Sequence, residues 1–305
     1  MAHGFFDLQV NGYVGVDFHR PGLTLEAMGR VEAALRAHGT TRILFTLVTD
    51  AIATMAEQLR HVERLCAESA GLRTMIAGYH IEGPYLLPEA GYQGAHDPRK
   101  MKAPDRGEFD QLWAASGGRV RLITLAPEWP GSPEFIRHVV GHGVRVAIGH
   151  SNADERALEA AIAAGLTLCT HVGNGVPQQL HRHDNIVQRL LARDELTAVF
   201  IPDGVHVPPG TLRNFVRAKP RGRVLFTTDC VSPAGAPPGR YTIGRHEVEV
   251  GADGVVREPG KPHFVGSSLT MDRAIENVQR FLGWTRAEAE WSCGAGVARA
   301  LGLPE

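Results

Sequence analysis

The sequence has few cysteines, and no two of them stand at metal-ligand spacing. The 305 residues hold four cysteines and no CxxC pair, at Cys66, Cys169, Cys230 and Cys293. This wide spacing argues against a disulfide framework and against a thiolate zinc site. We expect reduced thiols in a cytoplasmic protein.

An excess of charge and a long apolar run are also absent. Lysine plus arginine number 32 against 33 aspartate plus glutamate, which leaves a formal net charge of −1 with histidine neutral. No basic run occurs, so the charge pattern argues against nucleic acid or an anionic membrane as a partner. No apolar stretch is long enough to span a bilayer. The first residues, MAHGFFDLQVNG, lack the charged start and apolar core of a signal peptide.

Linkers and low-complexity tracts are missing as well, which favours one domain over residues 1–305. Hydrophobic residues make up 43% of the chain, enough to fill a sizeable core. Short apolar runs rich in β-branched residues predict strands. Eight such runs are FFDLQV (5–10), RILFTLV (42–48), TMIAGYHI (74–81), VRLITLA (120–126), VRVAIG (144–149), LTLCT (166–170), LTAVFI (196–201) and VLFTT (224–228).

Helical patterns separate most of these runs. Thr24 is a candidate N-cap with Gly39 as the stop, Gly71 ends the next pattern, and Asn152 or Asp154 begins another. Strands alternating with helices imply parallel pairing, and eight such units imply a closed (β/α)8 TIM-like barrel. A doubly wound open sheet is the alternative, disfavoured because no glycine-rich dinucleotide turn follows the first run. We predict helices at 23–39, 53–71, 132–142, 151–165, 208–218, 270–282 and 285–301.

Two segments interrupt the alternation. Residues 82–107 are rich in glycine and proline and follow the third run. Residues 230–266, after the last run, contain HEVEVGADGVVREPG, which predicts a small β-excursion with a DG turn. Loops after barrel strands form the pocket, so we expect both insertions to shape the substrate site.

Four polar residues, Glu82, His150, His171 and Asp229, each lie at the C-terminal end of an apolar run. A parallel barrel brings such ends to one face. Two imidazoles and a carboxylate suit a divalent metal that keeps a position open for water and lowers the pKa of that water. The remaining carboxylate is then free to move protons. One such residue alone is better explained as a helix cap or loop contact; four at one level favour a hydrolytic metal site.

Several motifs, in order along nearly the whole chain, resemble those of the amidohydrolase superfamily and, within it, the N-acetylglucosamine-6-phosphate deacetylase family. They are GFFDLQVNGYVGVDF (4–18), GYHIEGPYL (78–86), YQGAH (92–96), IGHSNA (148–153), THVGN (170–174), PDGVHV (202–207), TTDCVSPAGA (227–236), GSSLTMDRAI (266–275) and ARALGL (298–303).

The resemblance implies roles for the four strand-end residues. Glu82, His150 and His171 correspond to metal ligands, and Asp229 to the catalytic acid and base. One divalent metal per subunit is implied, with zinc expected and iron, manganese or cobalt also accepted by such nitrogen and oxygen ligands. The superfamily often has Asp-x-His-x-His at the first strand, where this chain has Gln and Asn in place of the two histidines. A complete second metal site is therefore not expected.

The resemblance also implies the substrate contacts. Asn174, the backbone of Gly175 and His206 match positions that hold the sugar and polarise the acyl carbonyl, with His206 stabilising the oxyanion. Gln9 is a further substrate-binding candidate, and His96 matches a loop histidine near the substrate. The implied reaction is hydrolysis of the acetamide of an N-acetylated amino sugar, N-acetylglucosamine 6-phosphate first, to the amine and acetate.

The chain departs from the family pattern in the region that would meet the phosphate. Asn174 is followed by Gly175-Val176 where the family has Ala-Met. Arg182, which falls where the family places an arginine reaching a neighbouring subunit's sugar phosphate, lies within QQLHRHDN (178–185). This histidine-rich run could bind phosphate, bind another acidic group, or be an exposed loop.

The first predicted strand starts within five residues of Met1, and the sequence ends at Glu305, so no separate β-sandwich domain of the family type is expected. Barrel surface left uncovered would then be buried by a second subunit. Together with the implied role of Arg182, this predicts a homodimer.

Three other functions stay open. A deacetylase of an N-acetylgalactosamine phosphate, an unphosphorylated sugar or another N-acyl amide would keep the chemistry. Deamination of a ring amidine is disfavoured, because the EGP and DGVH segments match deacetylases. A non-catalytic sugar-phosphate sensor is disfavoured, because Asp229 and all three ligand candidates are present.

Overall fold

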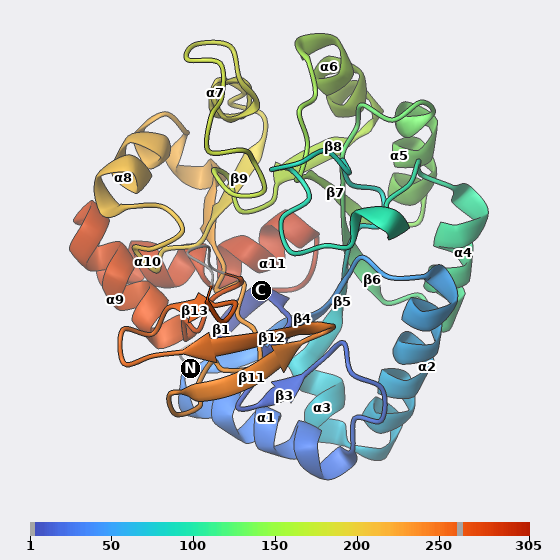
Figure 1. The fold of residues 1–305 in the computed structure, drawn as a ribbon, viewed down its shortest axis with the longest axis vertical. Coiled ribbons are helices and arrows are strands. Elements are labelled where there is room, and N and C mark those ends of the chain that lie inside the picture. The colour runs from blue at the N-terminus through green and yellow to red at the C-terminus, as the bar shows by residue number, and fades with distance from the viewer. Residues whose placement is uncertain (1–3, 261–264) are drawn as a thin grey trace.

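The computed structural model describes residues 4–260 and 265–305. Eight strands form one sheet in the order β1-β4-β5-β6-β7-β8-β9-β10, and every pair of neighbours is parallel (Figure 1). The predicted (β/α)8 barrel is confirmed, and each predicted run overlaps one of these strands. Their bounds are β1 Phe5–Val10, β4 Thr40–Val48, β5 Ile76–Glu82, β6 Val120–Leu125, β7 Arg145–Ile148, β8 Leu166–Cys169, β9 Thr197–Phe200 and β10 Val224–Phe226.

Helices surround the barrel (Figure 1). Thr24 caps α1 as predicted, Gly39 follows it with φ 77°, and Asp154 rather than Asn152 caps α6. The helices are α1 Leu25–Ala37, α2 Ile52–Glu68, α3 Ala70–Met75, α4 Arg106–Ala115, α5 Ser132–Gly141, α6 Glu155–Ala164, α7 Ile186–Leu191, α8 Pro209–Arg217, α9 Met271–Leu282, α10 Arg286–Ser292 and α11 Ala295–Leu301, with 3-10 turns at Pro98–Lys100 and Arg221–Arg223.

Two predicted helices were wrong in extent. The pattern at 53–71 is two helices, because Ser69 is extended (φ −133°, ψ 113°) and its side chain accepts from Leu72 N to start α3. Gly71 therefore lies inside α3 and stops nothing. The pattern at 285–301 is also two helices, α10 and α11, separated by Gly294 with φ −149° and ψ −100°. The sequence prediction missed α4 and α7, although Asp105 and Asn185 cap them in the ordinary way.

The barrel is nearly closed between its first and last strands. β1 and β10 do not pair as strands, but a bridge joins Val10 to Cys230, and Asn11 N donates to Cys230 O at 2.8 Å. Beneath this bridge, the hydroxyls of Thr227 and Thr228 donate to the buried carboxylate of Asp7. Side-chain hydrogen bonds thus join β1 to the segment after β10, where few backbone hydrogen bonds connect the first and last strands of the barrel.

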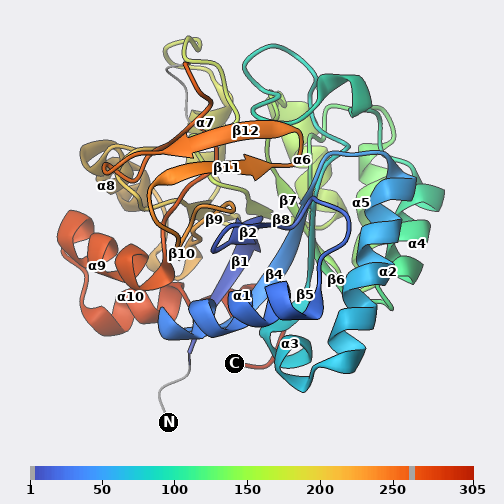
Figure 2. The ribbon, with the colours of Figure 1, turned by 60° about the horizontal axis from the view of Figure 1, so that its bottom comes forward.

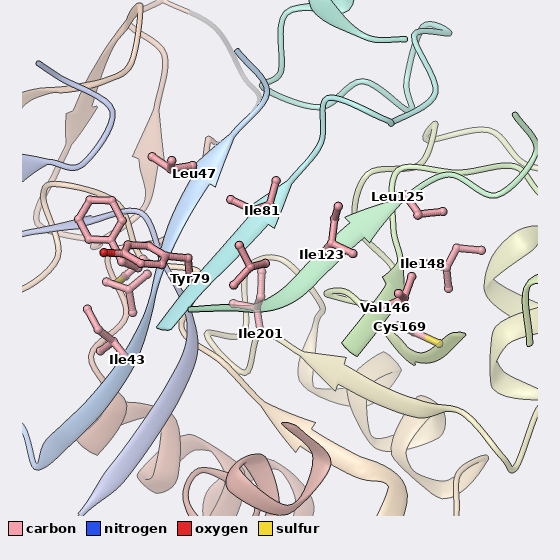
Figure 3. Close-up of a cluster of buried hydrophobic side chains, with 14 of the residues drawn as sticks. Ile43, Leu47, Tyr79, Ile81, Ile123, Leu125, Val146, Ile148, Cys169 and Ile201 are labelled. Carbon is pink, nitrogen blue, oxygen red and sulfur yellow. The ribbon is translucent and has the colours of Figure 1, made fainter. Parts of the chain in front are cut away.

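The two faces of the sheet bury separate apolar layers. One layer packs the strands against the helices, and Figure 3 shows part of it, including Ile43, Ile81 and Ile123. The other takes one or two side chains from each of seven strands, with Ala77 of β5 packed against it, and adds Val297, Ala298 and Leu301 of α11. The backbone bond from Phe6 N to Cys293 O, at 2.8 Å, ties the start of β1 to the residue that follows α10. α11 therefore covers the end of the barrel where the strands begin.

The β-excursion predicted after the last barrel strand is a three-stranded sheet, β11 Gly239–Ile243, β12 His246–Val250 and β13 Val256–Arg257. In Figure 2 its first two strands lie across the barrel at the end away from both termini. A small hairpin of β2 Gly12–Tyr13 and β3 Val16–Asp17 follows β1. Within the described ranges, no helix is both long and apolar enough to cross a membrane.

Candidate active site

The four strand-end residues converge on one cavity, as predicted. Glu82 is the last residue of β5, His150 and His171 come two residues after β7 and β8, and Asp229 comes three residues after β10. All four line a cavity of about 550 Å³ at the C-terminal end of the barrel strands. Both insertions contribute to its wall, through residues such as Gly94 and Ile243.

Glu82 lies at the centre of the cluster. His171 Nε2 is 3.0 Å and His150 Nε2 3.4 Å from Glu82 Oε1. One donor atom from each of the three residues lies within 4.8 Å of the others, and all three residues are buried. Burial by itself would raise the pKa of Glu82, but hydrogen bonds with His150 and His171 hold it well below its usual range.

The backbone fixes the ring of His150. Its Nδ1 lies 2.7 Å from the carbonyl oxygen of Tyr92, which only accepts, so Nδ1 carries a proton and Nε2 is the nitrogen that faces Glu82. A Cβ added at Gly94 or Gly175 would lie 2.8 Å or 2.7 Å from this ring, so both positions need glycine for close approach. A ring held in this tautomer is suited to bind a metal through Nε2.

The donor set fits a divalent metal. Two imidazole nitrogens and a carboxylate oxygen are ligands that zinc and other transition metals accept, and three protein ligands leave one position open. Buried Gln9 Oε1 and Asn11 Oδ1, next to Glu82 and Asp229, have no hydrogen-bond partner among the residues that the structure describes. Unpartnered acceptors beside the cluster favour a bound cation or the water around it.

Asp229 lines the same cavity as the cluster. Asn11 Nδ2 donates to Asp229 Oδ1 at 2.8 Å. Burial and the negative charge of Glu82 raise the pKa of Asp229 to about 8 in the protein without metal. A cation at the cluster would oppose this rise, since opposite charge favours the ionised carboxylate. Asp229 is placed to exchange protons with a molecule in the cavity.

Two further histidines reach the cavity. His206, in the loop after β9, is oriented by Asp203, whose Oδ2 is 2.6 Å from His206 Nδ1. His96 is buried, with Nδ1 2.9 Å from Thr49 Oγ1 and Nε2 3.9 Å from Glu82 Oε2. Burial and the neighbouring His150 lower the pKa of His96 to about 3, so its ring is neutral at physiological pH.

Asn174 and Gly175 also line the cavity, as expected of substrate contacts. Gln9 does not: its side chain is fully buried and donates from Nε2 to Glu82 Oε2 at 3.0 Å. This bond gives Gln9 a positioning role for Glu82, and its contact with substrate stays a prediction. Arg182 is exposed in the loop before α7 and lies outside the cavity of the single chain.

Sequence reasoning missed several residues of this site. The carbonyl of Tyr92, the carboxylate of Asp203 and the amide of Asn11 orient the functional side chains. Arg245 and His246 at the β11–β12 turn line the cavity and join the excursion to the other insertion: Arg245 Nη1 is 3.0 Å from Asp97 Oδ2, and His246 Nε2 is 3.2 Å from Ala95 O. The one available signal was Asp203, three residues before His206 on the same loop.

No family model matches the chain. The N-acetylglucosamine-6-phosphate deacetylase of Bos taurus is 34% identical over 313 residues, covering 99% of this chain and 75% of that protein. The human protein of the same name is 35% identical over 316 residues, with the same coverage. The chain belongs to the N-acetylglucosamine-6-phosphate deacetylase family. The N-acetylgalactosamine-6-phosphate deacetylase of Escherichia coli O157:H7, a related protein, is 32% identical and covers 99% of the chain and 78% of its own length.

Solved structures of this deacetylase family agree. That of a Mycobacterium smegmatis mutant in complex with N-acetyl-D-glucosamine-6-phosphate has a TM-score of 0.89 at 33% identity, covering 99% of this chain and 78% of that one. The Thermotoga maritima deacetylase has a TM-score of 0.86 at 27% identity, with the same coverage. A 2,6-dihydroxybenzoate decarboxylase, at 12% identity and a TM-score of 0.53, shares the fold alone. The expected membership of the amidohydrolase superfamily is confirmed.

Proposed function

We propose that the chain hydrolyses the acetamide of an N-acetylated amino sugar 6-phosphate, with N-acetylglucosamine 6-phosphate as the preferred substrate. The observation that carries this proposal is the buried cluster in which His150 and His171 both present Nε2 to Glu82 Oε1, in a cavity that Asp229 also lines. Hydrolysis of an amide needs an activated carbonyl, a water and a proton carrier, and this arrangement offers a place for each.

Glu82, His150 and His171 would hold one divalent metal, and zinc suits their nitrogen and oxygen donors. Iron, manganese or cobalt would also be accepted. Such an ion supplies Lewis-acid activation of the acyl carbonyl and of the attacking water. Gln9, through its bond to Glu82 Oε2, keeps the carboxylate turned so that Oε1 faces the two imidazoles.

The remaining residues handle protons and substrate. Asp229 accepts a proton as the water oxygen bonds to the acyl carbon, and returns it to the amide nitrogen as the C–N bond breaks, releasing acetic acid and the amine. His206, oriented by Asp203, faces the cavity where it would stabilise the oxyanion. Asn174 and Gly175 line the wall on which the sugar would lie.

The alternative substrate differs in the sugar epimer, with galactosamine in place of glucosamine. One relative, at 32% identity, is named an N-acetylgalactosamine-6-phosphate deacetylase, so this substrate is the alternative. Homodimer formation, a cytoplasmic location and the phosphate contact of Arg182 stay predictions. In the single chain Arg182 is exposed outside the cavity, which is compatible with a role in a neighbouring subunit.

The test is acetate release by the zinc-loaded chain from N-acetylglucosamine 6-phosphate, N-acetylgalactosamine 6-phosphate and unphosphorylated N-acetylglucosamine. We expect the first to be hydrolysed with the highest kcat/KM. Asp229→Asn should keep its metal and lose kcat by a factor on the order of 10² to 10⁴, the usual contribution of a general acid and base. His150→Ala should lose both metal and activity.

Each outcome bears on a separate part of the proposal. Activity on none of the three sugars would contradict the substrate class. Substantial residual kcat in Asp229→Asn would remove Asp229 as the proton carrier, and full metal occupancy in His150→Ala would remove His150 as a ligand.

A further inference from the structure

A second group of metal-ligating side chains lies on the outside of the barrel, between α4 and α5. Asp110 belongs to α4, His138 to the last turn of α5, and His142 is the residue that caps α5. One donor atom from each lies within 4.8 Å of the other two, the same condition that the cluster around Glu82 meets. None of the three lines the active-site cavity.

Hydrogen bonds set the donor atoms of this group. His138 Nε2 lies 2.6 Å from Asp110 Oδ1, so an imidazole nitrogen and a carboxylate oxygen from different helices already face each other. His142 Nδ1 is 3.0 Å from the backbone carbonyl oxygen of His138. Since a carbonyl only accepts, Nδ1 of His142 carries the proton, and Nε2 of the neutral ring keeps its lone pair. A metal-binding histidine usually shows this arrangement, with its other nitrogen donating to a carbonyl.

Aromatic packing holds the two imidazoles in place. The ring centroids of His138 and His142 are 4.9 Å apart at an interplanar angle of 64°. His142 also packs edge-on against Phe109, at 5.4 Å, and against Trp113, at 5.2 Å. Phe109 is fully buried, so the rings rest on a fixed part of α4. Little side-chain entropy then remains to be lost when a ligand binds.

The cluster of Asp110, His138 and His142 is open to solvent on the side away from Phe109 and Trp113. The side chain of His138 is 26% exposed and that of Asp110 is 51% exposed. An ion can therefore enter without opening the fold. Donor atoms around a tetrahedral zinc lie roughly 3.3 Å apart, given metal–ligand distances of about 2.0–2.1 Å. The exposed carboxylate of Asp110 can close the difference by rotating about its own side-chain bonds.

We propose that Asp110, His138 and His142 form a second divalent transition-metal site that joins α4 to α5. Two imidazoles and one carboxylate select zinc, copper, nickel or cobalt over magnesium and calcium, which prefer an all-oxygen shell. Three protein ligands leave the outward position to water. Bound metal links two neighbouring helices of the barrel and stabilises the folded state by mass action.

The experiment measures zinc stoichiometry by equilibrium dialysis of the metal-stripped full chain. We expect two equivalents in the wild type, one in His142→Ala, one in His150→Ala and none in the double variant. Because the ring of His142 is also a packing element, Asp110→Asn provides a second variant that keeps the ring in place. In Asp110→Asn the affinity for the second equivalent should fall by at least about tenfold. His183→Ala, which alters an exposed histidine outside both clusters, is the matched control and should bind two.

A second readout is independent of catalysis. In the His150→Ala background, added zinc should raise Tm with increasing concentration, and the additional change His142→Ala should abolish the rise. One equivalent in the wild type and none in His150→Ala would overturn the α4–α5 site, as would a second equivalent that persists in both His142→Ala and Asp110→Asn. Two equivalents in His150→Ala would instead contradict the active-site ligand assignment and leave the α4–α5 site standing.

Discussion

At the residue scale, three of the four converging side chains come from backbone in the left-handed region. His150, His171 and Asp229 have φ of 51°, 27° and 48°. Such conformations cost a non-glycine residue about 1–3 kcal/mol and persist where the surrounding structure enforces them. Each lies just beyond the end of a barrel strand, where the chain must turn from the strand into a loop. The strain is concentrated on the residues that we assign to the chemistry.

Asp7 offers a pH test of the closure beneath the site. Its side chain is buried and accepts from Thr227 and Thr228, and burial raises its pKa to about 6, with these hydrogen bonds opposing the rise. The folded-state pKa lies above the unfolded value, so the proton on Asp7 favours folding and this stability is lost as pH rises through 6. The difference between the ordinary value of 3.8 and about 6 corresponds to roughly 3 kcal/mol.

In Asp7→Asn the side chain at position 7 is uncharged at every pH. The free energy of unfolding of this variant, minus that of the wild type, should therefore increase by up to roughly 3 kcal/mol between pH 4 and 7.5. Urea denaturation of both metal-free proteins at each pH measures this difference. Titrating groups that do not sense the charge of Asp7 are common to the two proteins and cancel. A difference independent of pH would show that Asp7 is ionised in the fold at every pH tested.

At the element scale, side-chain caps decide where helices start. Thr24 and Asp154 cap α1 and α6 in agreement with the sequence pattern. Periodicity alone predicted α2 and α3 as one helix, and α10 and α11 as another. The apolar spacing continues across Ser69 and Gly294, whereas the helical backbone is interrupted there. A helix break is set by the local φ and ψ of one residue, which a pattern summed over many residues does not register.

The capping box of α10 provides the prediction at this scale. Thr285 accepts from Glu288 N, and Glu288 Oε2 accepts from Thr285 N at 2.8 Å. Thr285→Ala removes the acceptor for the helix N–H and should cost about 1 kcal/mol, whereas Thr285→Ser keeps it. Urea denaturation midpoints check this. Equal stability of the Ala and Ser variants would show that the cap contributes nothing measurable.

At the scale of the whole molecule, the barrel is covered at one end and functional at the other. α11 closes the end where the strands begin, through Val297, Ala298 and Leu301. The opposite end carries the cavity, the two insertions and the three-stranded sheet (Figure 2). Stability and chemistry therefore rest on residues at opposite ends of the same strands, as is usual for this fold.

Leu301→Ala tests whether stability at one end of the barrel and metal binding at the other are independent. Leu301 is 3% exposed within the layer that α11 buries, so truncation should cost roughly 2–5 kcal/mol. Zinc stoichiometry below the new Tm should not change, because the cavity is at the other end. Leu25→Ala, at a leucine that is 39% exposed, is the matched control and should stay within about 0.5 kcal/mol. Loss of metal in Leu301→Ala would mean that the ends are coupled.

The sequence by itself determined the eight strands, the parallel barrel and the side of it on which Glu82, His150, His171 and Asp229 meet. These follow from apolar runs and strand–helix alternation, which are local signals, and from the rule that parallel strands joined by crossovers point the same way. Family motifs spread along nearly the whole chain then carried the class of reaction.

Only the tertiary structure decided which atoms face each other. Gln9 turned out to position Glu82 across 73 residues of chain, and Thr227 to bond Asp7 across 220. The tautomer of His150 depends on the carbonyl of Tyr92, 58 residues away. Hydrogen bonds are directional and short, so a one-residue change in the register of a strand removes them. The apolar pattern of each segment can be read from the sequence without knowing which distant segments it meets. The sequence located the site; the packing of distant segments set its geometry.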